Sequence, residues 1–349
     1  MSEWYRKLWQ PEGPNGVAYR ALSALLAPAE GSYRMAVSVR GWAYDRGLFA
    51  SKAGGIPTLV VGNLTVGGTG KTPVAAWFAS RLAELGERPA IVLRGYGGDE
   101  TKVHRVLNPD LPVYAYPDRW SGVERAGAEG SRVAVLDDAF QHRALRPDAS
   151  VVLVSAEEYT DRPRLLPRGP WREPLRSLDR ATLVVVTRKR VSEQASVSVA
   201  QRLADRERAV PQARAYIGMA GLAGYDASSG ALGEAQALEG FQGTLAVAGV
   251  AHPESVWAQL RDAGVTVERR LAFPDHHRYS SEDVRKISSE AAGGVLIATL
   301  KDAVKLGSVL DPAVAVYVPV QEVLWESGRQ EIDCLLAKLL ERRSGAVDY

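Results

Sequence analysis

A glycine-rich turn between an apolar run and a helical segment restricts the folds open to this chain more than any other feature. Residues 56–61 form the apolar run, and residues 73–85 carry apolar side chains at helical spacing. The turn reads Thr-Val-Gly-Gly-Thr-Gly-Lys-Thr over residues 65–72. Its glycines allow several backbone N–H groups to point at one anion, and the N-terminus of the following helix adds positive charge. The sequence therefore predicts a phosphate-binding loop between a strand and a helix.

The residues of this loop have separate expected tasks. Lys71 is expected to reach the terminal phosphates of ATP, and the Thr72 hydroxyl is expected to bind Mg²⁺. Val66 stands where partitioning and metal-pump ATPases carry a signature lysine. The alternative is a glycine-rich turn whose lysine is only solvated. Contacts with the nucleotide are expected from Thr65, Val66, Gly67, Gly68, Thr69, Gly70, Lys71 and Thr72.

Two aspartates end a second apolar run. Residues 133–136 lead directly into Asp137 and Asp138. Because the carboxyl ends of parallel strands meet at one edge of a sheet, we expect this pair beside the phosphate loop, as ligands of Mg²⁺. A turn or a helix cap would use the same residues. Gln141 follows the pair and is expected to contact the nucleotide or to hydrogen-bond around it.

Strands and helices alternate along most of the chain, which predicts an α/β protein. Apolar runs without polar alternation are typical of a parallel sheet covered by helices on both faces. We expect a P-loop NTPase-like parallel sheet flanked by helices over residues 53–213 and a second, smaller α/β domain over residues 214–349 that contributes to the active-site cleft. The predicted strands are 56–61, 89–93, 133–136, 150–154, 182–187, 244–250, 294–299 and 314–318. The predicted helices are 73–85, 192–208, 329–343 and two that begin at Pro253 and Asp302.

The segment 1–52 precedes this alternation and is predicted to form two amphipathic helices. It holds seven Lys and Arg residues against four Asp and Glu residues. Two interpretations remain open. The helices pack on the core, or they touch anionic lipid through basic side chains together with Trp4, Tyr5 and Trp9.

Composition excludes several classes of protein. The net charge of +2 gives no support to nucleic-acid binding, which needs a dominant positive field. Cys334 is the only cysteine, which excludes a disulfide framework and a cysteine-based zinc site and favours a reducing compartment. No stretch reaches the ~18–20 apolar residues of a membrane span. We therefore expect a cytoplasmic protein without a secretory signal.

Six further motifs follow in a characteristic order. With the phosphate loop they resemble the tetraacyldisaccharide 4′-kinase family, the lipid A kinases of Gram-negative bacteria, over residues 17–325. The motifs are Arg-Gly-Tyr-Gly-Gly at 94–98, Asp-Asp-Ala-Phe-Gln-His at 137–142, Leu-Pro-Arg-Gly-Pro-Trp-Arg-Glu at 166–173, Ala-Gly-Val-Ala-His-Pro at 248–253, Phe-Pro-Asp-His at 273–276 and Thr-Leu-Lys-Asp-Ala-Val-Lys at 299–305.

The resemblance implies transfer of the γ-phosphate of ATP to the 4′-hydroxyl of a tetraacyldisaccharide 1-phosphate. It also implies an Asp–His pair that activates this hydroxyl, and Asp99 and His276 are the matching residues. Arg172 is expected to contact the transferred phosphate or a phosphate of the acceptor. Because the acceptor is a lipid, the enzyme would lie at the inner face of the cytoplasmic membrane. The resemblance implies no obligate protein partner.

Other functions and other roles stay open at this point. A membrane-associated switch ATPase that acts with a protein partner fits the loop and the basic N-terminal segment, although Val66 and Phe-Pro-Asp-His count against it. A relative that binds nucleotide without catalysis is a further alternative. Single residues also have structural alternatives. Asp99 could be a turn residue, His276 a solvated loop residue, and Arg172 an ordinary surface charge.

Overall fold

The computed structural model describes residues 16–95, 98–291 and 293–344. Trp4, Tyr5 and Trp9, which the sequence assigns to a lipid contact, lie outside these residues. The described helices are α2 (Gly16–Asp45), α3 (Lys71–Glu84), α4 (Asp99–Leu107), α5 (Arg119–Ala128), α6 (Glu193–Ala204), α7 (Pro253–Asp262), α8 (Ser281–Ala291), α9 (Leu300–Leu306) and α10 (Arg329–Ser344), with a 3₁₀ helix at Leu175–Arg180.

One mixed sheet runs through the chain. Its first part is parallel throughout, in the order β4 (Val113–Ala115), β3 (Pro89–Leu93), β5 (Val133–Asp137), β2 (Thr58–Asn63), β7 (Ala149–Ser155), β8 (Leu183–Arg188) and β9 (Gln212–Asp226). The sheet continues from β9 through β14 (Ala315–Ser327), β13 (Val295–Ala298), β11 (Gln242–Ala248) and β12 (Thr266–Ala272). β14 is antiparallel to β9, and β10 (Ala231–Gln236) pairs with the other edge of β9. A separate parallel pair joins β1 (Lys52–Ala53) and β6 (Leu145–Arg146).

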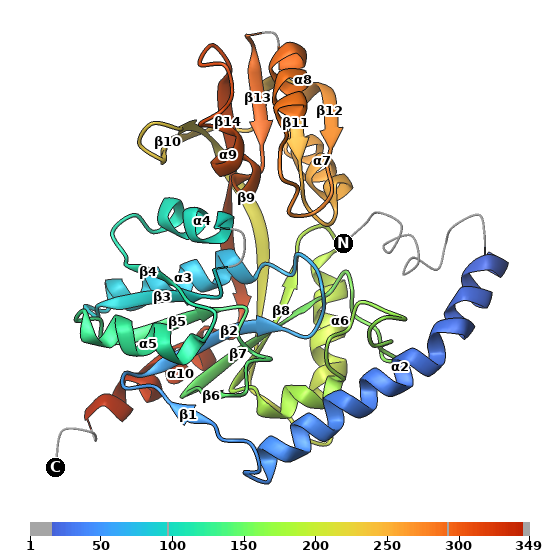
Figure 1. Ribbon diagram of the computed structural model, residues 1–349, viewed down its shortest axis with the longest axis vertical. Coiled ribbons are helices and arrows are strands. Elements are labelled where there is room, and N and C mark those ends of the chain that lie inside the picture. The colour runs from blue at the N-terminus through green and yellow to red at the C-terminus, as the bar shows by residue number, and fades with distance from the viewer. Residues whose placement is uncertain (1–15, 96–97, 292, 345–349) are drawn as a thin grey trace.

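The chain forms two parts joined by the long strands β9 and β14 (Figure 1). Strands β2, β5 and β7 are buried on both faces, which explains why their sequences lack polar alternation. Leu59 and Val61 of β2 pack with Val74 and Phe78 of α3 on one face of the sheet. The neighbouring side chains of β2 face the other way, into a second apolar cluster. The predicted α/β class, with a mostly parallel sheet flanked by helices, is confirmed.

The C-terminal helix α10 packs on the first part of the sheet. Ile332, Leu335, Leu336 and Leu339 belong to the same apolar cluster as Leu59. Strand β14 makes this possible, because it leaves the second part alongside β9 and delivers α10 to the first. Residues 329–344 therefore lie apart from the second domain to which the sequence assigns them.

Within the described residues the N-terminal segment forms one continuous helix, α2, where the sequence predicts two. Pro28 lies inside α2, where its ring nitrogen cannot donate to the carbonyl of Ala24. Ala24 is exposed, so water can take the place of that donor. The helix is tied to the first part by Tyr33, whose hydroxyl donates to the Arg172 carbonyl at 3.1 Å. Among the described residues, no helix combines the length and the apolar character needed to cross a bilayer.

Candidate active site

The predicted phosphate loop leaves β2 at Asn63 and enters α3 at Lys71. Gly70 caps α3 with a φ of 92°, a left-handed conformation that favours glycine. No side chain caps this end of α3, so its first backbone N–H groups have no side-chain acceptor. Uncapped N–H groups at a helix N-terminus are the donors that bind phosphate oxygens in proteins.

Lys71 bends back over this loop. Its Nζ lies 3.2 Å from Asn63 Oδ1, 3.4 Å from the Gly67 carbonyl and 4.0 Å from Asp138 Oδ1. Burial lowers the pKa of the Lys71 ammonium, against the attraction of Asp138. A second ammonium lies nearby, because Lys189 Nζ donates to the Gly68 carbonyl at 2.7 Å. Two ammonium groups therefore lie at the loop, and the sequence indicates only that of Lys71.

Asp137 joins the loop to a buried histidine. Thr72 Oγ1 donates to Asp137 Oδ2 at 3.0 Å, and His104 Nε2 hydrogen-bonds to the same oxygen at 2.9 Å. The other oxygen, Asp137 Oδ1, is buried and has no hydrogen-bond partner among the described residues. A carboxylate oxygen next to a threonine hydroxyl suits a hard divalent cation, so the chemistry of Asp137 and Thr72 is compatible with binding Mg²⁺.

Asp138 holds the guanidinium of Arg172. The two Nη atoms of Arg172 lie 2.8 and 3.3 Å from the two carboxylate oxygens, in a bidentate pair. Arg172 also donates to Asn63 Oδ1, the oxygen that receives Lys71. Burial alone would raise the pKa of Asp138, but Lys71 and Arg172 outweigh it and lower the pKa to about 2. Arg172 therefore lies at the loop, with its charge paired to Asp138.

Gln141 hydrogen-bonds to the last residue of β2, just before the loop. Its side-chain Nε2 donates to the backbone carbonyl of Asn63 at 2.7 Å. The backbone carbonyl of Gln141 accepts from Arg40 of α2 at 3.2 Å. Gln141 thus hydrogen-bonds to the strand end that precedes the loop. Asn63 is the common partner of Gln141, Arg172 and Lys71.

Asp99 and His276 form a second cluster between the two parts of the chain. Asp99 is the first residue of α4, and His276 lies between β12 and α8. His276 Nδ1 is 3.4 Å from Asp99 Oδ2, and Lys305 Nζ of α9 is 3.0 Å from the same oxygen. The structure therefore brings together the two residues that the resemblance pairs, and adds a lysine.

Charge determines the protonation of this second cluster. Burial of Asp99 favours its neutral form, but the contacts with His276 and Lys305 prevail and hold its pKa well below the usual range. The contact with Asp99 in turn raises the pKa of His276, against a smaller effect of burial. The pair is thus a carboxylate facing an imidazole that binds its second proton more tightly than usual.

Backbone conformation marks both clusters. Asp138, with a φ of 51°, and His276, with a φ of 58°, are the two non-glycine residues of the described chain with positive φ. Such residues persist where surrounding contacts hold them, and they concentrate at functional sites. One carboxylate of the loop cluster and the imidazole of the second cluster are therefore held in conformations that their own sequence does not favour.

Helix α4 connects the two clusters. Asp99 at its start faces His276, and His104 in its last turn reaches Asp137. Glu100 beside Asp99 lies 3.9 Å from Lys301 of α9, which adds a contact across the two parts. Any movement of α4 changes both the loop cluster and the Asp–His pair.

Sequence reasoning missed His104, Asn63 and Lys305. Lys305 carried a detectable signal, because it follows Lys301 by four residues and therefore lies on the same helical face within one motif. Asn63 ends β2, two residues beyond the predicted strand and two residues before the predicted loop. A lone histidine in a polar segment, such as His104, carries no comparable signal.

We predict that His104→Phe destabilises the fold. The ring space stays filled, but the buried Asp137 carboxylate loses a hydrogen bond, which costs about 1–3 kcal/mol. Urea unfolding would measure the change. His142→Phe is the control, since its ring lies 3.5 Å from the exposed Asp118, and a change below about 0.5 kcal/mol is expected there. Equal effects in both variants would contradict the prediction.

Comparison with known proteins agrees with this geometry. The family model described as tetraacyldisaccharide-1-P 4′-kinase matches residues 22–340. A tetraacyldisaccharide 4′-kinase of Halorhodospira halophila is 37% identical over 314 residues, which cover 85% of this chain and 88% of that protein. One from Geobacter metallireducens is 38% identical over 335 residues, which cover 87% of this chain and 94% of that protein.

A solved structure extends the match to the fold. The crystal structure of LpxK from Aquifex aeolicus in complex with ATP aligns with a TM-score of 0.70 and 27% identity, covering 92% of this chain and 99% of that one. The sequence resemblance is therefore confirmed along nearly the whole chain. This protein belongs to the tetraacyldisaccharide-1-P 4′-kinase family.

Proposed function

We propose that this protein transfers the γ-phosphate of ATP to the 4′-hydroxyl of a tetraacyldisaccharide 1-phosphate, a step of lipid A biosynthesis. Its family and its relatives support the reaction. The observation that carries the proposal is the placement of a phosphate loop and an Asp–His pair at opposite ends of α4. Such a site has both parts that phosphoryl transfer to an alcohol needs, a holder for the donor and an acceptor-activating group.

The donor end is the loop with Lys71. The N–H groups from Thr65 to Thr72 surround the phosphates, and the Lys71 ammonium exchanges its contact with Asn63 for the terminal phosphate oxygens. Arg172 adds positive charge next to Asp138. ATP as the donor is supported by the relative from Aquifex aeolicus, whose crystal structure is a complex with ATP.

Thr72, Asp137 and Asp138 are the proposed ligands of Mg²⁺. The partnerless oxygen of Asp137 and the Thr72 hydroxyl favour direct binding there, while Asp138 is occupied by Arg172. When bound, Mg²⁺ neutralises charge on the β- and γ-phosphates. His104 keeps the Asp137 carboxylate in place for this task.

Asp99 receives the proton of the acceptor hydroxyl. The hydroxyl oxygen bonds to the γ-phosphorus, the bond to the β-phosphate oxygen breaks, ADP leaves, and the hydroxyl proton passes to Asp99. A carboxylate whose pKa lies below its usual range is a weak base. This suffices because phosphoryl transfer passes through a loose transition state and depends mostly on positioning and electrostatic stabilisation. His276 and Lys305 orient the carboxylate.

A direct assay tests the proposed reaction. The protein is incubated with γ-³²P-ATP, Mg²⁺ and tetraacyldisaccharide 1-phosphate in neutral detergent micelles, and a labelled lipid is expected. ATP hydrolysis that depends on a protein partner, without labelled lipid, would favour a switch ATPase, which the family match does not favour. ATP binding with neither product would contradict the proposed acceptor.

We propose further that α2 rests on the inner face of the cytoplasmic membrane. One face of this helix is exposed, carries no charge and is almost entirely apolar, while Arg40 lies at its edge. A continuous apolar face beside basic side chains suits an anionic lipid surface. The residues of this face, here called the exposed α2 face, are Ala21, Ala24, Leu25, Pro28, Ala29, Ser32, Met35, Ala36, Val39 and Trp42.

Charges placed on the exposed α2 face should release the protein from lipid. The double variant Met35→Glu/Val39→Glu should bind vesicles about 100-fold more weakly, since each side chain loses about 10-fold of apolar insertion. Cosedimentation with phosphatidylglycerol-containing vesicles measures this. The matched control, Leu85→Glu/Leu324→Glu, changes two apolar residues that are also exposed but lie elsewhere. If both double variants sediment alike, the membrane proposal is wrong.

A further inference from the structure

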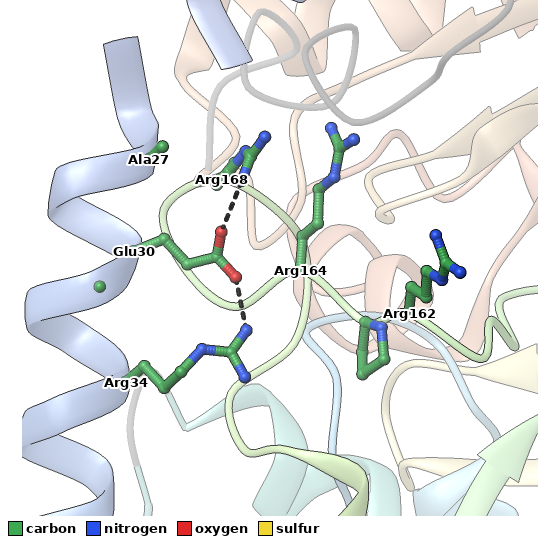
Figure 2. A pocket seen from close by; sticks show the side chains of 8 residues that line it. Ala27, Glu30, Arg34, Arg162, Arg164 and Arg168 are labelled. Atoms are coloured by element: carbon green, nitrogen blue, oxygen red, sulfur yellow. Dashed lines mark hydrogen bonds and ion pairs between the residues drawn. The ribbon is translucent and has the colours of Figure 1, made fainter. Parts of the chain in front are cut away.

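A cavity lined by arginines lies beside α2, apart from the loop and the Asp–His pair. Its volume is about 600 Å³, and it opens between α2 and the segment 162–168. Figure 2 shows Glu30 between Arg34 of the helix and Arg168 of the facing segment, which also carries Arg162 and Arg164. Nothing in the proposed transfer reaction uses these four guanidinium groups.

Buried side chains of α2 hold three of these four arginines in place. Glu30 is 6% exposed and lies 2.8 Å from Arg34 and 3.3 Å from Arg168. Ser23 Oγ accepts from Arg164 at 2.8 Å and from Arg168 at 2.9 Å. The arrangement therefore orders long side chains that would otherwise move freely on a surface.

Positive charge exceeds negative charge among the described residues that line the cavity. Burial would raise the pKa of Glu30, but the Leu165 N–H, Arg34 and Arg168 hold it below its usual value, so Glu30 is ionised. Among the described lining residues, four guanidinium groups stand against this single carboxylate, a net charge of +3. Among the described residues, the Arg162 guanidinium makes no ion pair.

We propose that this cavity binds the phosphate group of a membrane lipid. Guanidinium groups match phosphate oxygens in charge and in paired hydrogen bonds. The volume exceeds that of a phosphate alone and leaves room for a glycerol or a sugar attached to it. The exposed α2 face starts on the same helix, so a lipid bound here would have apolar surface for its acyl chains.

The cavity is also connected to the loop cluster. The chain runs on from the segment 162–168 to Arg172, which pairs with Asp138. On the way, the Pro170 carbonyl accepts from the Val66 N–H at 2.7 Å. The lipid phosphate has two possible sources. It is the headgroup of an anionic phospholipid, or it is the 1-phosphate of the acceptor; only the second source rests on the proposed function.

Neutralising two arginines tests the site. Arg34→Gln/Arg162→Gln is compared with Arg261→Gln/Arg285→Gln, which removes the same charge from α7 and α8. Partition onto phosphatidylcholine vesicles that contain phosphatidylglycerol should fall about 25-fold at low salt in the first variant and stay near wild type in the control. Because Arg34 contacts the buried Glu30, Arg162→Glu serves as a second variant that disturbs no ion pair of the described chain.

A second assay separates the two sources. In neutral detergent micelles the KM for tetraacyldisaccharide 1-phosphate should rise about 10-fold, with unchanged kcat, if the cavity holds the 1-phosphate. Weaker vesicle binding with unchanged KM assigns the cavity to a phospholipid headgroup. Weaker vesicle binding together with a raised KM means that the cavity accepts the phosphate of both lipids. If neither variant of the cavity differs from the control in either assay, the proposal is overturned. A wild-type protein without transferase activity contradicts the proposed function, while the vesicle assay still tests the cavity.

Discussion

Lys71→Ala should lower phosphate transfer about 10³-fold or more. The Lys71 ammonium is the charge that α3 places over the loop, within reach of Asn63, Gly67 and Asp138. In the reaction it meets the charge that develops on the transferred phosphate, and loss of one such electrostatic contact in a closed site costs at least 10²–10³-fold in rate. Initial rates of lipid labelling from γ-³²P-ATP measure the effect.

Unfolding of the same variant separates catalysis from folding. Burial lowers the pKa of Lys71, so folding disfavours its charged form, and removal of the side chain should leave the fold at least as stable at neutral pH. Urea unfolding should therefore give the wild-type midpoint or a higher one. A variant that loses activity because it unfolds would contradict this interpretation.

Lys189→Ala provides a matched control at the same loop. Its Nζ also binds a loop carbonyl, that of Gly68, but it comes from the end of β8 instead of the start of α3. We expect a clearly smaller loss of rate from this variant. If Lys189→Ala were as damaging as Lys71→Ala, the specific role of Lys71 at the terminal phosphates would be wrong.

The loop and the acidic pair were predictable because their geometry follows from the sheet. Residues that end neighbouring parallel strands must lie at one edge, and β2 and β5 are direct neighbours. Asp137 therefore reaches Thr72 across 65 residues of sequence. Strands β2 and β5 were also recognisable, since burial on both faces leaves an uninterrupted apolar run.

Helix α4 was not predictable from local pattern. Its nine residues read Asp-Glu-Thr-Lys-Val-His-Arg-Val-Leu, and its few apolar positions resemble those of many solvated turns. What fixes it is tertiary, namely the contacts of Asp99 with Lys305 and of His104 with Asp137. The edge strand β12 was missed for the opposite reason, because its exposed side chains remove the apolar signal.

The helix α2 shows the limit of periodicity. The apolar spacing was recognised, but an apolar face reads the same whether it packs on a core or faces lipid. Leu25, Met35 and Val39 are exposed, whereas Tyr33 and Ser38 face the protein and hydrogen-bond to it. Only the fold shows that one side of the helix packs on the protein while its apolar side stays exposed.

Asp99→Asn should lower kcat about 10²–10⁴-fold while ATP affinity stays close to wild type. The substitution keeps the shape of the side chain but removes the carboxylate that receives the hydroxyl proton. The proposed nucleotide contacts lie toward the other end of α4, so the substitution does not directly change the loop. Transfer assays at saturating ATP and acceptor, with nucleotide titration in parallel, measure both quantities.

The imidazole next to Asp99 gives a readout independent of activity. Contact with Asp99 is the main cause of the raised pKa of His276, so this pKa should fall in Asp99→Asn, as NMR titration can measure. In the wild type, the pair stabilises the fold below the unfolded pKa of histidine, about 6.5, and this contribution is lost as pH rises through the raised pKa.

Asp283→Asn is the matched control for this pair. Asp283 lies 3.0 Å from His277, the residue that directly follows His276. This second Asp–His pair is in the same part of the chain but outside the proposed site. The same change of charge there should leave kcat within about 3-fold of wild type, because Asp283 and His277 lie outside the proposed site. The pKa of His276 should not change, because Asp283 pairs with His277 and not with His276. Equal losses of kcat in Asp99→Asn and Asp283→Asn would show that the fold of this part, and not proton transfer at Asp99, limits the reaction. A large loss confined to Asp99→Asn, together with the lower pKa of His276, would instead place the proton acceptor at the start of α4.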